Sequence, residues 1–120
     1  MLWKIELEYN ALAVMKEITN TLIDRGYYAD PKGKQLEKNV TTLGVADTGE
    51  TAFLLYAYKK NKAIRIIAHN QTSILEITSG FYNEKTNLVE LKDQALKSFN
   101  GLDQKQLLQA SNFLEELLND

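Results

Sequence analysis

The sequence contains no cysteine, one histidine and one proline among its 120 residues. Without cysteine there are no disulfide bonds, no thiolate nucleophiles and no cysteine-ligated zinc or iron–sulfur sites. Because His69 is the only histidine, we expect neither a histidine-rich metal site nor a Ser–His–Asp triad. The sequence therefore predicts no metal and no other cofactor, and the lack of cysteine is typical of a cytoplasmic protein.

Long hydrophobic runs are also missing. The longest apolar stretches have the length of β-strands, so none can span a bilayer and we expect no membrane partner. The N-terminus interleaves acidic and apolar residues, unlike a signal peptide. Hydrophobic residues make up 44% of the chain and charged residues 25%, which is ordinary for a folded protein. We expect a single domain over residues 1–120.

The charge is distributed unevenly around a net value of −2. Residues 31–65 carry seven basic and three acidic side chains, whereas residues 1–30 carry three and five, and residues 66–120 carry four and eight. The middle third is therefore positive between two acidic flanks. This distribution excludes a uniformly cationic nucleic-acid-binding protein but permits a local basic patch.

The first third of the chain predicts a strand and then a helix. Residues 2–9 alternate between apolar and charged side chains, as a half-buried strand does, although a helix from Leu2 is the alternative because its apolar residues also share a helical face. After Asn10 the apolar residues recur at helical spacing. Gly26 is placed where a glycine ends a helix.

The middle of the chain predicts an antiparallel sheet. Residues 40–45 read as a strand, and three strand-like runs follow over residues 51–79, separated by two short polar turns. The first of these runs is apolar on both faces and should be central. The last carries Glu76 and Thr78 on one face, which favours an outer position.

The C-terminal third predicts two helices. Asn87 and Glu90 resemble a capping box before an apolar stripe that reaches Phe99, and Asp103 caps a second helix. Together these patterns predict an α+β fold, in which an antiparallel β-meander of four to five strands, twisted enough to curl toward a half-barrel, packs with one N-terminal helix and a C-terminal αα-hairpin.

Asp47-Thr48-Gly49 resembles the Asp-Thr-Gly motif of retroviral-type aspartic proteases. The resemblance implies a dimeric enzyme in which two such aspartates share a proton. It covers three residues only, because Ile66-Ile67 is followed by Ala68-His69-Asn70 instead of the Gly-Arg-Asn or Gly-Arg-Asp of that family, and the predicted helices do not belong to its all-β fold. A hairpin turn is the favoured interpretation, and we predict no catalytic residue.

Arg65 and His69 lie four residues apart on one face of a predicted strand. They are candidates for binding an anion such as a phosphate or carboxylate. The alternative is that both point to solvent or pair with acidic side chains such as Glu76 on the neighbouring strand.

The turn after the first run of the meander combines lysines with tyrosines. Single-stranded nucleic acids are bound by such surfaces, with lysines on the phosphates and aromatic rings against the bases. Alternatively, the lysines keep a hairpin tip soluble while the tyrosines belong to the core. Lys32, Lys34 and Lys38 would enlarge the basic patch if their loop folds nearby. The predicted nucleic-acid-binding residues are Lys59, Lys60, Lys62, Arg65, Tyr56 and Tyr58.

The last predicted helix offers an apolar stripe that either faces a partner or covers the sheet. Its predicted interface residues are Phe113, Leu114, Leu117 and Leu118. The sequence thus predicts a small non-enzymatic regulatory module that binds RNA or single-stranded DNA through its basic-aromatic hairpin. The alternative is a protein–protein adaptor or homodimer that uses the C-terminal helical hairpin.

Overall fold

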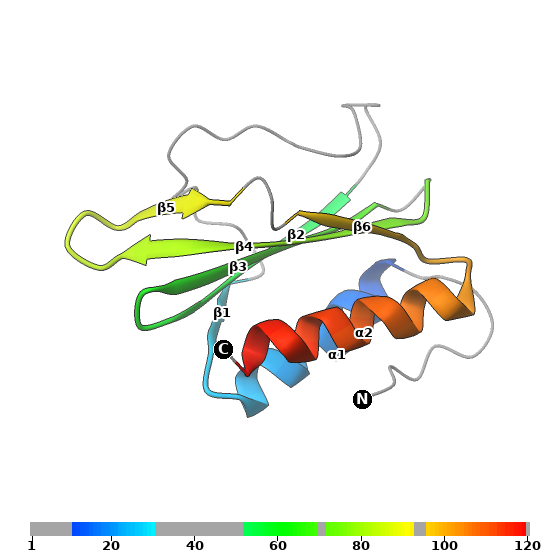
Figure 1. Ribbon diagram of the computed structural model, residues 1–120, viewed down its shortest axis with the longest axis horizontal. Coiled ribbons are helices and arrows are strands. Elements are labelled where there is room, and N and C mark those ends of the chain that lie inside the picture. The colour runs from blue at the N-terminus through cyan, green and yellow to red at the C-terminus, as the bar shows by residue number, and fades with distance from the viewer. Residues whose placement is uncertain (1–10, 31–51, 70–71, 93–95, 120) are drawn as a thin grey trace.

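The computed structural model describes residues 11–30, 52–69, 72–92 and 96–119. Two helices lie side by side on one face of an antiparallel sheet, which we call the helix face (Figure 1). The fold is therefore mixed α+β, as predicted. In chain order the elements are α1 (Ala11–Asp24), β1 (Tyr28–Asp30), β2 (Ala52–Lys59), β3 (Lys62–His69), β4 (Ile74–Asn83), β5 (Leu88–Leu91), β6 (Lys97–Asn100) and α2 (Gln104–Leu118).

The sheet has six strands in the described part of the chain. Its order is β1-β2-β3-β4-β5, and β6 also pairs with β4. β4 is long enough to hold both partners along one edge, with β6 beside Ile74–Ile77 and β5 beside Gly80–Asn83. The prediction that β4 occupies an outer position is therefore wrong, because β3 lies on its other side.

The meander itself is confirmed. β2 lies between β1 and β3, so the strand that is apolar on both faces is central. β2 and β3 are joined by the two residues Lys60 and Asn61, with Lys59 paired to Lys62. Lys60 has a φ of 56°, the left-handed conformation that tight hairpin turns require and that most residues adopt reluctantly.

α1 ends as its sequence predicts. Gly26 has a φ of +83°, its N–H donates to the carbonyl of Ile23 (3.0 Å), and the N–H of Tyr27 donates to the carbonyl of Leu22 (2.9 Å). This is the Schellman arrangement, in which a left-handed glycine closes the last turn. Leu22 and Tyr27 are both buried, so the same turn also packs the chain against the sheet.

The main core lies between the helices and the helix face of the sheet. Both helices contribute buried side chains at intervals of three or four residues, as an amphipathic helix does. The fully or nearly buried members include Val14, Ile18 and Leu22 of α1, Leu107, Ala110 and Leu114 of α2, and Leu55, Ala57, Ile64, Ile66, Leu75 and Ile77 of the sheet.

The predicted αα-hairpin is wrong in its first half. Residues 88–91 and 97–100, which carry the apolar stripe assigned to a helix, form β5 and β6. Asn87, the predicted helix cap, instead adopts a φ of 56° in the turn between β4 and β5. β5 packs so closely on β4 that a Cβ at Gly80 would lie 2.2 Å from the carbonyl oxygen of Glu90. Pairing with β4 thus outweighs the local helical spacing.

The second half of that prediction holds, because α2 is a helix capped by Asp103. The carboxylate of Asp103 accepts a hydrogen bond from the N–H of Lys105 at 2.9 Å. Gln106 lies three residues after this cap, where a capping box would have its side chain accept from the N–H of Asp103. Its side-chain oxygen instead accepts from the N–H of Asn100 (2.7 Å). The predictions for residues 2–9, 40–45 and 47–49, and for Lys32, Lys34 and Lys38, lie outside the described residues.

Candidate functional site

Lys59 and Lys62, two of the lysines predicted to contact nucleic acid, contact the ends of the two helices. The ammonium of Lys59 donates to the carbonyl of Arg25, just after α1, at 2.9 Å, and lies 5.6 Å from the centre of the Tyr27 ring. The ammonium of Lys62 donates to the carbonyl of Leu117 in the last turn of α2. In the alternation of β2 and β3, both lysines lie on the same side of the sheet as the core residues of the helix face. Their side chains therefore reach the helix ends.

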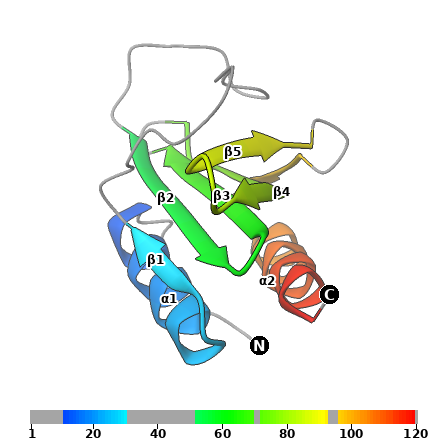
Figure 2. The same cartoon turned by 90° about the vertical axis from the view of Figure 1, so that its left-hand side faces the viewer.

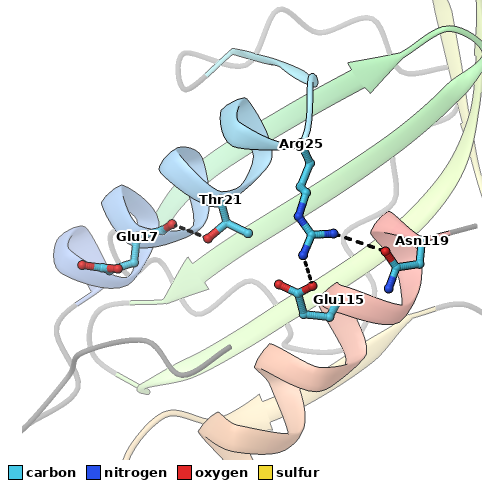
Figure 3. Close-up of polar contacts among 5 residues, drawn as sticks. All are labelled: Glu17, Thr21, Arg25, Glu115 and Asn119. Carbon is cyan, nitrogen blue, oxygen red and sulfur yellow. Dashed lines mark hydrogen bonds and ion pairs between the residues drawn. The ribbon is translucent and has the colours of Figure 1, made fainter.

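The two helices run in the same direction, so their C-terminal ends lie at the same end of the molecule (Figure 1 and Figure 2). Each end carries partial negative charge from carbonyls without a partner in the helix. Arg25, after α1, reaches across to the end of α2, where its guanidinium contacts the carboxylate of Glu115 and the side-chain oxygen of Asn119, the latter at 3.2 Å (Figure 3). Arg25, Lys59 and Lys62 therefore offset two helix dipoles, and we call these three residues the helix-end cluster.

The predicted tyrosines do not present their rings to solvent. Tyr56 and Tyr58 are 1% and 9% exposed, and they pack on the sheet face opposite the helices with Ala63 and Val89. The ring of Tyr58 lies 4.7 Å from that of Tyr82, measured between centroids. The tyrosines are placed in a second, smaller core, as the alternative interpretation of the sequence expected.

Arg65 and His69, the candidate anion-binding pair, lie on the same opposite face and are also buried. The imidazole Nε2 of His69 is 2.6 Å from a carboxylate oxygen of Glu76, so His69 pairs with the neighbouring strand. Thr78 is the register partner of Arg65. The other oxygen of Glu76 and the hydroxyl of Thr78 are buried without a hydrogen-bond partner among the described residues. Each of these two groups carries a desolvation cost that no hydrogen bond from the described residues offsets.

Lys60 is one of the residues that line a groove between the β2–β3 turn and the β4–β5 hairpin, which we call the hairpin groove. Phe81, another lining residue, is 53% exposed, and the ammonium of Lys92 lies 4.4 Å from the centre of its ring. Among the described residues, the groove is lined by Lys60, Asn61, Phe81, Tyr82, Asn83, Glu84, Lys85, Thr86, Leu88 and Glu90. The groove thus contains one of the predicted lysines, Lys60, together with an exposed aromatic ring that was not among the predicted binding residues.

Hydrogen bonds fix the walls of the hairpin groove. The N–H of Tyr82 donates to the carbonyl of Asn61 (2.8 Å), which joins the two hairpin tips. The hydroxyl of Tyr82 donates to the side chain of Asn87 (2.7 Å), and the side chain of Asn83 accepts from the N–H groups of Lys85 and Thr86. The groove is therefore preorganised by its own turns.

The predicted interface residues of α2 face the molecule itself. Leu114 is fully buried and Leu118 nearly so, while Phe113 and Leu117 are partly buried against the same core. The exposed apolar side chains near α2 are different ones, namely Leu102 just before the helix (64% exposed) and Leu108 in its first half (41%).

Comparison with protein-family models, with curated proteins and with solved structures found no match. In the part of the chain that the structure describes, the helices are too short or too polar to cross a membrane. The same residues contain no group of three or more histidine, aspartate or glutamate side chains arranged to hold a metal ion.

Proposed function

We propose that this protein is a small, non-enzymatic regulatory module of the cytoplasm that binds RNA or single-stranded DNA at the hairpin groove. The observation that carries the proposal is that Lys60 of the β2–β3 turn and the exposed ring of Phe81 line the same groove. Proteins bind single strands with this combination of a cation for the phosphate and a ring for the base. The proposal moves the ligand away from Tyr56 and Tyr58, whose rings are buried.

The test is a fluorescence anisotropy titration with a labelled, unstructured oligonucleotide at low salt. We expect binding that weakens steadily as salt is raised, since phosphate contacts release counterions. Lys60→Glu should weaken binding about tenfold, because it removes one phosphate contact and adds a repulsive charge.

Lys105→Glu is the matched control. Lys105 is exposed in the first turn of α2, at the end of the helix away from the hairpin tips, and the substitution changes the net charge by the same amount. Equal losses in the two variants would mean that only overall charge matters, and the groove would be abandoned as the site. Absence of binding by the wild-type protein at low salt would end the nucleic-acid proposal.

A protein–protein adaptor or homodimer is the second candidate, and the exposed leucines near the start of α2 favour it. Leu102 is 64% exposed and Leu108 is 41% exposed, although both side chains are large and apolar. If the protein is a homodimer, sedimentation equilibrium should show a dimer. Leu108→Lys should dissociate this dimer without changing the circular dichroism spectrum. A wild-type protein that stays monomeric at high concentration would exclude the homodimer.

A further inference from the structure

Phe81 has an unusual place for an aromatic ring. It belongs to β4 and pairs with Lys62 of β3 and Glu90 of β5, so its backbone lies inside the sheet. Its position in the alternation of β4 matches that of Leu75 and Ile77, which are buried under the helices. Unlike Leu75 and Ile77, Phe81 is about half exposed, although it lies on the same face of the sheet. A rigid backbone thus presents a large apolar face to solvent, where burial would be favourable.

The charges around the ring suit a phosphate chain. The ammonium of Lys92 lies 4.4 Å from the ring centre, within the range of a cation–π contact. Lys60 and Lys85 line the same groove. Together with Lys92, the groove therefore carries three lysines and the two carboxylates of Glu84 and Glu90.

We propose that Phe81 is the platform on which one unpaired base stacks, and that Lys60 and Lys92 contact the neighbouring phosphates. This inference rests on the proposed function and specifies its ligand. A base in a duplex already has neighbours on both of its faces, whereas a base of a single strand has a face free for an aromatic ring. The groove therefore selects a single strand over a duplex.

The experiment uses an unstructured oligonucleotide that carries one 2-aminopurine, whose fluorescence reports its stacking. We expect saturating wild-type protein to change this fluorescence and to bind the duplex of the same sequence at least tenfold more weakly. Phe81→Ala should weaken single-strand binding about tenfold or more, as the loss of one stacked base does, and should abolish the fluorescence change at saturation. Phe81→Tyr, which keeps an aromatic face, should retain both.

Tyr28→Ala is the control, because Tyr28 is another exposed aromatic residue, 61% exposed, on β1 at the far side of β2 and β3. Two results overturn the inference while salt-sensitive, Lys60-dependent binding of the single strand still supports the proposed function: single-strand binding that Phe81→Ala leaves intact, or an equal loss with Tyr28→Ala. Equal affinity for duplex and single strand overturns the inference and the proposed single-strand function together. Absence of any binding by the wild-type protein overturns both. A circular dichroism spectrum of each variant identifies a loss caused by unfolding, and in that case Phe81→Leu, which keeps the apolar bulk without the ring, decides the outcome.

Discussion

The helix-end cluster and the hairpin groove use neighbouring lysines of one turn in opposite ways. Lys59 and Lys62 pair across the hairpin and face the helices, where their ammonium groups bind main-chain carbonyls. Lys60 lies between them in the sequence but belongs to the turn itself and lines the groove. Lysines that are adjacent in a sequence therefore need not share one surface of the folded protein. Strand register decides which of them stabilise the fold and which remain available to a ligand.

The largest expected loss of stability comes from a substitution in the core that supports both the helix-end cluster and the hairpin groove. Leu114 is fully buried between α2 and the sheet. Leu114→Ala should lower the free energy of unfolding by about 3 kcal/mol, since it removes buried methyl groups and leaves a cavity. Urea denaturation measures the loss. Unchanged stability together with loss of a dimer would instead restore the earlier interpretation of Leu114 as an interface residue.

Lys62→Ala separates the two regions directly. It removes the cation at the end of α2, so we expect a loss of about 1 kcal/mol in unfolding free energy with little change in oligonucleotide affinity. Lys60→Ala should show the reverse, with unchanged stability and weaker binding. Urea denaturation and anisotropy titrations of the two variants test this pair of expectations. If both variants lose the same affinity and neither loses stability, the division between cluster and groove is wrong.

The smallest expected change in stability concerns the β2–β3 turn, which separates Lys59 from Lys62. Lys60 adopts a left-handed φ, which glycine tolerates without steric cost. Lys60→Gly should therefore be more stable than Lys60→Ala by about 0.5–1 kcal/mol, although both lack the ammonium group. Thermal unfolding of the two variants measures the difference. A glycine variant less stable than the alanine variant would contradict the turn conformation.

Much of the fold was predictable where the signal is local. The end of α1 at Gly26, the turn at Lys60 and the cap at Asp103 each follow from a few adjacent residues. β5 and β6 were not predictable in this way, because their apolar residues also fit a helical period and only pairing with β4 decides between the two. Gly80 allows β5 to approach β4 closely, because a larger residue there would collide with Glu90. The sequence alone does not show this, since it does not show that β5 is the neighbouring strand.

The candidate site was predictable only in part. The sequence placed Lys60 at a hairpin tip, and the structure places it there. It did not show that Lys59 and Lys62 reach carbonyls of the helices, since the position of a helix end relative to a distant hairpin is a tertiary fact. Phe81 was not predicted as a binding residue because β4 continues several residues beyond the predicted strand. Its exposed fraction is a property of the tertiary structure.

The buried polar row on the face opposite the helices has a consequence for folding fidelity. Arg65, His69, Glu76 and Thr78 all lie on that face when β3 and β4 pair as they do, with Arg65 beside Thr78 and Ile67 beside Glu76. A slip of one residue in either strand would turn that strand's charged groups into the apolar core beneath the helices. Misaligned sheets are thereby penalised far more heavily than they would be in a uniformly apolar meander. The buried polar row therefore specifies the register in which β3 and β4 pair.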